Sequence, residues 1–439
     1  MTYLAISLLI LIVYHHIGYP VLLKLIAQIK SKQEADVANR TRRFKDTEQD
    51  SELPSIHIIV PAFNEEAVIQ QKVDSMAWLD YPDNKLSISI YCDGCHDETV
   101  KKAIASQNLF HNRDLDIQVI NIKKNGGKIL IINRAIKETH SDLIVFSDAS
   151  SILSSDTLMR SAAHFMADPN IAVVTGDYSL LTSVSKQAQQ QATEGEKAYW
   201  QYQNKVRSLE SKLGSVMGVT GAYYAIRREY CHTLETDTIN DDFIMPMRAV
   251  EQGGKAIFDE KIKIFETEAT PLEEDAKRRV RISQGNLQQI FRLKSLLLPR
   301  MNYQRFWVSW MFISGKFLRV IMPFILTSLF IFSAILAFDS IFFQLLLSGQ
   351  VLAYGLAMIN RLVTAGASGK GVDEGDESVV RKVLNSIFDN KICRLISYLC
   401  QGHLMGFIGS ASYLQSMFKK HVLGINSDQR WHKVEIKDK

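Results

Sequence analysis

Charged residues are unevenly distributed along the 439 residues of the chain. Four segments contain no Asp, Glu, Lys or Arg: residues 2–23, 320–338, 340–360 and 395–418. Their lengths match the roughly 20 residues that a helix needs to cross the hydrocarbon core of a bilayer. The block from about residue 30 to residue 300 mixes polar and apolar positions in the ordinary way. The pattern predicts a membrane protein with one large water-exposed region.

Short apolar runs alternate with amphipathic stretches in the first half of that region. The runs predict strands at 56–60, 86–91, 116–120, 143–146 and 171–175, and helical spacing predicts helices at 65–78, 97–107, 128–139 and 155–166. This alternation is typical of the α/β class, with a mostly parallel sheet covered by helices on both faces. Right-handed crossovers place the turns after the strands at one edge, where open α/β sheets bind ligands.

The chain after residue 175 has longer polar, basic and aromatic segments. We expect a polar helix at 187–213, a glycine-containing turn into a strand at 218–229, a helix at 243–252, a basic amphipathic helix at 276–298 and an aromatic-rich interfacial stretch at 302–316. The predicted domains are an N-terminal transmembrane anchor at 1–29, a linker at 30–55, the α/β domain at 56–300, an interfacial segment at 301–316, two transmembrane helices within 317–363, a cytosolic loop at 364–394, a third hydrophobic segment at 395–418 and a basic tail at 419–439.

Basic residues follow the first apolar segment at once, beginning with Lys24, Lys30 and Lys32. The positive-inside rule therefore predicts a multi-pass protein of the inner membrane with its α/β domain in the cytoplasm. A cleaved signal peptide is not expected, because no basic region precedes the segment and no small-x-small site follows it. Three C-terminal crossings would export the basic tail, so segment 395–418 either crosses the membrane or is interfacial or re-entrant.

Composition narrows the function classes. A net charge of +4 with 22% charged residues is ordinary, and no nucleic-acid partner is expected. Cys92 and Cys95 match a C-x-x-C pattern, but a zinc site of this type needs a second pair. We expect neither zinc nor a redox role there. His15 and His16 lie in the first apolar segment and are expected to be neutral residues near the interface.

Acidic residues mark the expected ligand edge. Asp93 and Asp148 each follow a predicted strand directly, and a third acidic group, Asp241 and Asp242, lies in a predicted loop. Separated acids that converge on one edge point to a cation, a phosphate ligand or proton transfer.

Two other turns at the same edge carry polar or glycine residues. Asn64 can cap the helix after the first strand, and Glu65 suits its N-terminus. Gly126 and Gly127 expose backbone N–H groups, and Lys128 adds a charge that a phosphate would meet. Each turn alone is also typical of an ordinary helix start, but four consecutive turns of this kind favour a single site.

Six short motifs occur in a fixed order: Pro61-Ala-Phe-Asn64-Glu65, Asp93-Gly94, Gly127-Lys128, Phe146-Ser-Asp148-Ala-Ser150, Gly221-Ala222 with Arg227-Arg228, and Asn240-Asp241-Asp242. The ordered set resembles the family 2 glycosyltransferases, in the membrane-anchored branch of cellulose-, hyaluronan- and poly-N-acetylglucosamine-synthase-like proteins. The resemblance covers about residues 55–300 and the flanking membrane segments. It implies a GT-A fold that binds a nucleotide-diphosphate sugar, usually a UDP-sugar, with Mg²⁺ or Mn²⁺.

The resemblance also implies roles for the motif residues. Asp93 would contact the uracil or ribose, and Asp148, the first acid of the family's Asp-x-Asp, would handle ribose and metal. Asp242 would be the general base, with Asp241 beside it, since a sugar hydroxyl must lose its proton as it attacks the anomeric carbon. The residues expected at the nucleotide sugar are Pro61, Asn64, Glu65, Asp93, Lys128, Asp148 and Ser150, and those expected at the diphosphate or acceptor are Gly221, Arg278, Arg281 and Gln284.

The sequence departs from the family pattern at two places. Ser150 stands where a second acid is common, so the metal would rest on Asp148 with the diphosphate and water, or on another residue such as His232 or Glu266. In the family's Gln-x-x-Arg-Trp motif, Arg281 keeps the arginine, but Ile282 replaces the tryptophan that floors a growing sugar chain. This second departure weakens the expectation of processive polymerisation.

We therefore predict a membrane-bound, inverting glycosyltransferase that acts on a lipid-linked or growing glycan in exopolysaccharide or cell-envelope synthesis. Its partners would be the nucleotide sugar, the acceptor, membrane lipid and other subunits of polysaccharide synthesis or export. Alternatives are single-sugar transfer to a polyprenyl phosphate or lipid, and a degenerate non-catalytic subunit, for which Ser150 is the main support. A transporter with a regulatory domain is poorly supported, because the membrane segments carry few charges.

Overall fold

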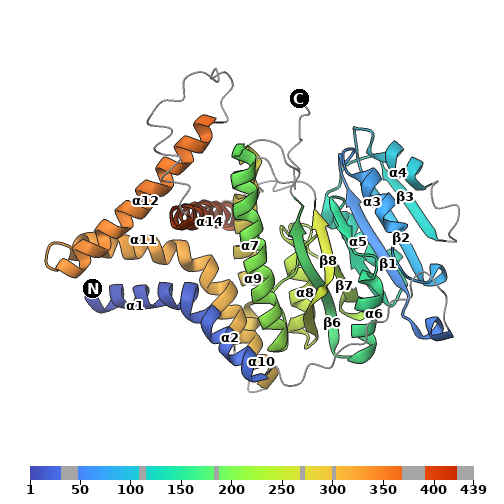
Figure 1. Cartoon of the computed structure of the whole chain (residues 1–439), viewed down its shortest axis with the longest axis horizontal. Helices are drawn as coiled ribbons and strands as arrows, with labels where there is room; N and C mark the ends of the chain where they lie inside the picture. Colours follow the sequence, from blue (N-terminus) through green and yellow to red (C-terminus); the bar gives the residue numbers. More distant parts are fainter. Residues whose placement is uncertain are drawn as a thin grey trace.

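The protein has two regions in a computed structural model. The model describes residues 1–30, 48–107, 115–181, 187–266, 272–298, 303–367 and 391–422. An α/β domain lies at one end and the long helices α1 (Thr2–Val13), α11 (Leu318–Leu336) and α12 (Ile341–Ala367) at the other (Figure 1). The helices α7 (Gln187–Lys212) and α9 (Leu272–Arg292) lie between them (Figure 1). The predicted linker, loop and basic tail fall largely outside the described residues.

One eight-stranded sheet forms the centre of the α/β domain, in the order β3-β2-β1-β4-β7-β6-β8-β5. The first four strands in this order are parallel, β7 is antiparallel to both of its neighbours, β6 and β8 are parallel, and β5 is an antiparallel edge strand. The strands are β1 (Ile56–Ala62), β2 (Leu86–Asp93), β3 (Asp116–Ile122), β4 (Leu143–Phe146), β5 (Ser151–Leu153), β6 (Ile171–Leu180), β7 (Tyr224–Arg227) and β8 (Lys255–Glu266). The predicted α/β class with a mostly parallel sheet is confirmed.

Helices cover both faces of the sheet, so the domain has two buried cores. On one face, residues of α3 (Ile69–Met76), α4 (Thr99–Gln107) and α6 (Thr157–Ala167) pack on apolar strand residues such as Ile58 and Val145. On the other face lie α5 (Lys128–Glu138) and α8 (Asp241–Glu251). The four residues of β4 are all buried, as expected of a central parallel strand with two covered faces.

Two strands were not predicted from the sequence. β5 has only three residues, and β8 carries the charged residues Asp259, Glu260 and Lys261 in its middle, which interrupt the alternation of apolar and polar positions. These residues belong to an irregularity in the pairing of β8 with β6, where the register shifts between Gly176 and Asp177. A Cβ atom on Gly176 would lie 2.4 Å from Ile262, so the glycine makes room for the bulged strand.

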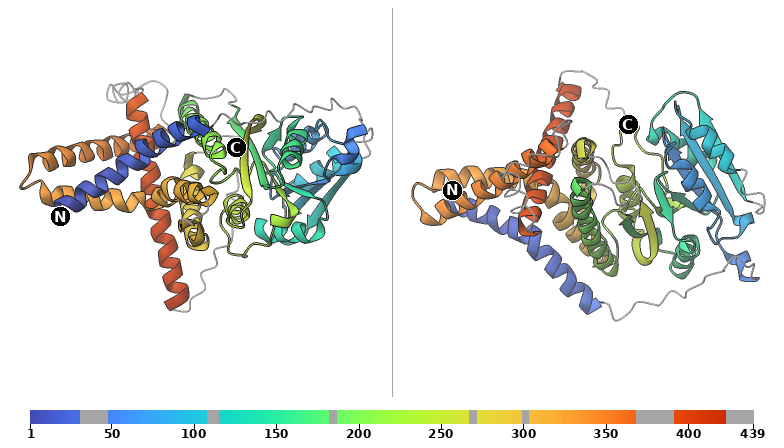
Figure 2. Two further views of the ribbon diagram at one scale, coloured as in Figure 1. Left: turned by 90° about the horizontal axis from the view of Figure 1, so that it is seen from below. Right: turned by 45° about the horizontal axis from the view of Figure 1, so that its top comes forward.

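Three helical segments among the described residues are long and apolar enough to cross a membrane: Thr2–Ile29, Arg305–Leu336 and Ile341–Ile359. The predicted segment 395–418 lies in α14 (Lys391–Val422), which is not one of these three. Figure 2 shows α14 crossing the direction of α1, α11 and α12. It packs against α9 of the α/β domain as well as against α11 and α12.

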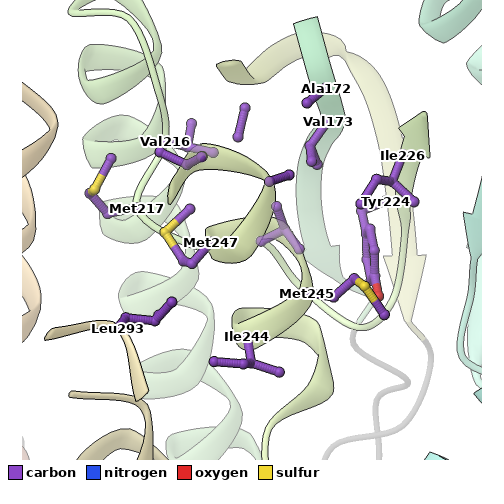
Figure 3. Close-up of a cluster of buried hydrophobic side chains, with 14 of the residues drawn as sticks. Ala172, Val173, Val216, Met217, Tyr224, Ile226, Ile244, Met245, Met247 and Leu293 are labelled. Carbon is purple, nitrogen blue, oxygen red and sulfur yellow. The ribbon is translucent and has the colours of Figure 1, made fainter. Parts of the chain in front are cut away.

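The apolar helices and the α/β domain share one core. The buried cluster on the α8 face of the sheet continues into Tyr19 and Leu23 of α2 (Tyr19–Lys30) and into Met311 and Phe312. Figure 3 shows Met245 and Met247 of α8 in the middle of this cluster, between the sheet and Leu293, just after α9. This packing fixes the N-terminus of α8, which carries Asp241 and Asp242, relative to the apolar helices.

Candidate functional site

The end of β4 brings Asp148 to the ligand edge of the sheet. Its backbone N–H donates to the carbonyl oxygen of Gly221, and a Cβ atom on Gly221 would lie only 2.7 Å from Asp148 Oδ2. Glycine at 221 therefore lets the carboxylate lie against the backbone. The Asp148 side chain is still 39% exposed, so a ligand can reach it.

Lys128 joins two of the predicted acids. Its Nζ atom lies 3.0 Å from Asp148 Oδ1 and 3.2 Å from Asp241 Oδ2. Burial opposes the charge of Lys128, but the carboxylates of Asp148, Asp241 and Asp242 outweigh it and raise the pKa of the lysine. Burial likewise opposes the charge of Asp148, whose pKa is nevertheless held below its usual value chiefly by Lys128. The structure thus brings Lys128, Asp148 and Asp241 into one ion-paired group, and their roles toward a ligand stay predictions.

Asp242 lies beside this ion-paired group. One of its carboxylate oxygens accepts a hydrogen bond of 3.2 Å from the backbone N–H of Gly221. Burial and the neighbouring Asp241 raise the pKa of Asp242 to about 6. A carboxylate with a pKa near neutrality is suited to accept a proton. The predicted loop around Asp241 and Asp242 is wrong in one respect, because α8 already begins at Asp241, with Asn240 as its N-cap.

Asp93 holds a backbone loop. Its two carboxylate oxygens accept hydrogen bonds from the backbone N–H groups of Gly126 and Gly127, at 2.8 and 2.7 Å. Gly94 follows in a left-handed conformation, with a φ of 66°, where a Cβ atom would lie 2.4 Å from the Asn125 nitrogen. The acid and the glycine together bring the start of α5 against the end of β2 and so orient Lys128. A direct contact of Asp93 with a nucleotide stays a prediction.

The turn after β1 carries the other predicted nucleotide residues. Pro61 lies in β1, and Asn64 has a φ of 52°. Asn64 does not cap a helix as predicted, because α3 begins at Ile69 and the Asn64 side chain instead accepts a hydrogen bond from the His96 backbone. The Glu65 backbone donates to Thr99 Oγ1 at 2.7 Å. The turns after β1 and β2 are therefore bonded to each other.

Ser150 and Glu266 supply further oxygen atoms near Asp148. The Ser150 hydroxyl donates to Glu266, which also accepts from the hydroxyl of Tyr178. His232 instead contacts Gln252, at the opposite end of α8 from Asp241. Of the two further metal ligands considered from the sequence, only Glu266 therefore lies near the Asp148 turn.

The oxygen donors of Asp148 suit a hard divalent cation. No group of three or more His, Cys, Asp or Glu side chains in the described part of the chain could hold a metal by itself. Asp148 could therefore help to hold a divalent cation together with oxygen atoms that other groups supply.

Helix α9 brings basic residues toward the acids. Asn240 donates to the carbonyl oxygen of Ile282, and a Cβ atom on Gly285 would lie 2.5 Å from the Asn240 side chain. This contact places α9 against the start of α8. Arg281 interacts electrostatically with Asp241, Asp242 and Asp148, and Arg278 with Asp148. Gln284 also lies on α9, at a place where α14 packs closely. Its backbone nitrogen is 3.3 Å from the position that a Cβ atom on Gly409 would occupy.

Two buried polar residues near the site were missed by sequence reasoning. Lys72 of α3 donates from Nζ to Ser147 Oγ, Ser151 O and Ser151 Oγ, at 2.6, 2.7 and 3.0 Å, and so supports the Asp148 turn from beneath. Burial lowers its pKa to about 7, although Asp148 and Glu266 oppose the shift. The signal was a lysine among the apolar residues of the α3 stripe.

Tyr224 of β7 is the second missed residue. Its buried hydroxyl has no hydrogen-bond partner among the described residues. Burial raises the pKa of Tyr224, and the charges of Asp241, Asp242 and Asp148 add to the shift. An unsatisfied buried hydroxyl beside three acids is a candidate contact for a ligand.

Cys92 and Cys95 are both free cysteines. They flank the Asp93 turn, and the Cys95 thiol lies 3.6 Å from the carbonyl oxygen of Ala62. The C-x-x-C spacing thus coincides with the turn that orients the start of α5.

Comparison with known proteins identifies the family to which the chain belongs. A family model described as "Glycosyltransferase like family 2" matches residues 54–285, which is more than half of the chain. An "N-acetylglucosaminyltransferase" of Rhizobium meliloti (strain 1021) is 29% identical over 177 residues, 40% of each chain. A "Poly-beta-1,6-N-acetyl-D-glucosamine synthase" of Staphylococcus aureus (strain COL) is 22% identical over 244 residues, 55% of this chain and 57% of the relative. The matches thus span less than two thirds of these relatives.

The whole chain also resembles a solved structure. The mannosyltransferase PcManGT from Pyrobaculum calidifontis, solved in complex with GDP-Man and Mn²⁺, superposes with a TM-score of 0.62 at 19% identity. The superposition covers 93% of this chain and 99% of that protein. At this level of identity the likeness concerns the fold, and it confirms the predicted GT-A fold.

Proposed function

The chain belongs to the glycosyltransferase-like family 2, and from that premise we propose that it transfers a sugar from a nucleotide-diphosphate sugar to a lipid-linked or growing glycan at a membrane. The observation that carries this proposal is the group of Lys128, Asp148 and Asp241 beside Asp242, whose pKa is raised to about 6. One ion-paired cluster can bind the donor, and a separate carboxylate can accept a proton.

We propose UDP-N-acetylglucosamine as the donor. The matched relatives in Rhizobium meliloti and Staphylococcus aureus are named for N-acetylglucosamine transfer or polymerisation. Asp93 would hold the start of α5 so that Lys128 faces the nucleotide, and Asp148 would lie at the diphosphate. Arg278 and Arg281 of α9 would approach the same group, where a guanidinium suits a phosphate leaving group.

The proposed reaction is a single displacement. The acceptor hydroxyl attacks the anomeric carbon, its proton passes to Asp242, and the bond to the diphosphate breaks with its electron pair on the departing nucleotide. Attack opposite the leaving group inverts the anomeric configuration. A divalent cation, held by Asp148 with the diphosphate and with Glu266 nearby, would neutralise charge on the leaving group when bound. Arg281 would add to this neutralisation.

The test is transfer by the full-length protein in membranes, with UDP-N-acetylglucosamine, UDP-glucose and GDP-mannose as radiolabelled donors. Each donor is tested with Mn²⁺, with Mg²⁺ and with a chelator, and the products are sized. We expect incorporation from UDP-N-acetylglucosamine that the chelator abolishes. Incorporation from GDP-mannose alone would overturn the donor assignment, and no incorporation from any donor would overturn the proposed activity.

Product length separates polymerisation from single transfer. Ile282, where the family pattern has tryptophan, is 37% exposed and offers an aliphatic surface to an acceptor. Sugar chains stack on aromatic rings, so this position favours short products. A single-sugar product would support the non-processive alternative, and a ladder of long products would support polymerisation.

A further inference from the structure

Three cations meet where the α/β domain joins the apolar helices. Arg207 lies on α7, Lys316 in the π-helical turn Phe312–Phe317, and Arg319 at the start of α11. Each of them acts electrostatically on the others: Lys316 on Arg319 and Arg207, and Arg207 on Arg319. We call these three residues the basic cluster. Like charges that gather away from water are unfavourable unless an anion joins them.

The acids around the basic cluster do not balance it. Glu210 and Asp242 act on both Arg207 and Lys316. The two carboxylate oxygens of buried Glu210 already accept hydrogen bonds of 2.9 Å from the Tyr19 hydroxyl and the Met217 backbone. Within the described residues, neither Arg207 nor Lys316 forms an ion pair with a carboxylate.

The contacts of these two cations are weak. Lys316 Nζ lies 5.4 Å from the centre of the Phe243 ring and has no hydrogen-bond partner in the described part of the chain. Arg207 is 8% exposed, lies 5.5 Å from the Trp200 ring and reaches Asn204 and the carbonyl oxygen of Val219 only at 3.5 and 3.4 Å. Several N–H donors of the two side chains are therefore available to an anion.

A short loop connects the basic cluster to the catalytic acids. The Cβ position of Gly218 lies 2.7 Å from Phe243 and 3.6 Å from Lys316 Nζ, whereas Gly221 touches Asp148 and Asp242. Three residues of extended chain span at most about 11 Å. Between the two glycines, the buried Thr220 hydroxyl has no hydrogen-bond partner among the described residues. The basic cluster and Asp242 therefore lie near the two ends of one short loop.

We propose that Arg207, Lys316 and Arg319 bind the phosphate group of a membrane-held acceptor, so that the acceptor is a glycan linked to a lipid through phosphate, whose sugar hydroxyl would reach Asp242. This inference rests on the proposed transferase function and adds the chemical class of the acceptor. Arg319 donates to the Tyr199 hydroxyl at 2.7 Å and lies near His15, His16 and His403. Arg319, His15 and His16 belong to helices that are long and apolar enough to cross a membrane, so the cluster lies where a lipid phosphate would be within reach.

The test measures acceptor binding apart from turnover. Full-length protein in phosphatidylcholine nanodiscs is titrated with a short-chain polyprenyl phosphate, with the matching polyprenol and with inorganic phosphate, and donor binding is titrated separately with UDP-N-acetylglucosamine. Variants are Lys316→Gln, Arg207→Gln and Lys316→Arg, with Lys205→Gln as a control because Lys205 is an exposed lysine on the same helix as Arg207. Thermal unfolding of each variant reports whether the fold is intact.

We expect the polyprenyl phosphate to bind at least tenfold more tightly than the polyprenol. The two glutamine variants should lose most of this preference, and Lys316→Arg and Lys205→Gln should keep it. Equal binding of phosphate and alcohol, or unchanged binding by folded Lys316→Gln and Arg207→Gln proteins, would overturn the proposal. If these variants lose donor affinity equally, the cluster belongs to the donor site, which also overturns it.

Two further arms identify the source of the phosphate and separate the proposals. Nanodiscs that contain phosphatidylglycerol test whether an ordinary lipid head group binds to the basic cluster. If this lipid competes with the polyprenyl phosphate on equal terms, the acceptor assignment is overturned. Inorganic phosphate that competes as well as the polyprenyl phosphate would do the same. A protein that binds polyprenyl phosphate but no nucleotide sugar would contradict the proposed function and leave this site intact.

Discussion

Asp148 and Gly221 lie so close that a Cβ atom on the glycine would be 2.7 Å from Asp148 Oδ2. Any side chain at 221 must therefore displace the carboxylate that is paired with Lys128. Gly221 also donates its backbone N–H to Asp242. One glycine thus determines the positions of two acids on different elements.

Gly221→Ala should lower transfer at least tenfold and raise the KM for the nucleotide sugar, while the protein remains folded. The reason is a shift of Asp148 away from Lys128, not a loss of core packing. Donor titration and thermal unfolding measure the two effects. Gly349→Ala is the control, because a Cβ atom there has no neighbour within 4 Å. A Gly221→Ala enzyme with wild-type KM would show that the position of Asp148 does not affect the donor.

The pH dependence of transfer should report Asp242. The base must be ionised, so kcat/KM should rise with pH through an apparent pKa near 6 and level off above it. Asp242→Asn should lose about 10²–10⁴-fold in rate, the usual contribution of a general base, and the acidic limb should disappear. Asp83→Asn, a change outside the site, serves as control. An acidic limb that persists in Asp242→Asn would assign it to another group.

Lys128→Gln should move the same limb toward higher pH. The lysine stabilises ionised Asp242, so its removal leaves burial and Asp241 to raise the pKa of that acid further above 6. Donor KM should rise as well, because Asp148 loses its ion pair. The exposed Lys124→Gln is the matched control. The measurement is the full pH profile of kcat/KM for each variant. If the acidic limb of Lys128→Gln lies at the same pH as in wild type, Lys128 does not influence the pKa of the base.

Lys72 should cost stability in a pH-dependent way. Burial lowers its pKa from 10.5 in the unfolded chain to about 7, so between these values the unfolded state binds more protons. Stability should therefore rise with pH across that range, and the penalty should be largest below pH 7. The Lys72→Met protein should lack this rise and should be at least as stable as wild type at pH 6.5. The reason is that replacing a buried charge with an apolar group is often neutral or stabilising. Thermal unfolding at pH 6.5 and 9.5 measures both.

The same variant should bind the donor less well, because the Asp148 turn loses three hydrogen bonds from the ammonium. Lys72→Arg and the exposed Lys101→Met serve for comparison. The stability of Lys72→Met is compared with that of wild type at each pH. If the substitution destabilises the protein more at pH 6.5 than at pH 9.5, the inferred lowering of the Lys72 pKa is wrong. Unchanged donor affinity would show that the turn holds its shape without the lysine.

The strands with uninterrupted apolar runs, and the turns after them, could be predicted from the sequence. Asp93, Lys128 and Asp148 all follow or begin such elements, so their placement at one edge of the sheet could be predicted, whereas the GT-A fold was implied by the resemblance to the family 2 glycosyltransferases. β8 could not be predicted, because its exposed bulge at Glu260 and Lys261 hides the alternation that periodicity detects.

The partners of single residues could not be predicted either. Glu266 reaches Ser150 because β8 pairs with β5, a contact across more than one hundred residues that no local pattern encodes. The contacts of Lys72 with Ser147 and Ser151 under the Asp148 turn likewise depend on tertiary packing. The basic cluster likewise joins α7 to a segment near residue 316 through long-range packing.

The contact of Gly409 with α9 has a consequence for where this chemistry can take place. α14 packs on α9, α9 holds Asn240, and Asn240 begins the helix that carries both acids. Through this series of contacts the carboxylates stand at a set height above the boundary defined by the apolar helices. For the proposed membrane-held acceptor, this height would select groups that project from the lipid surface by one set distance.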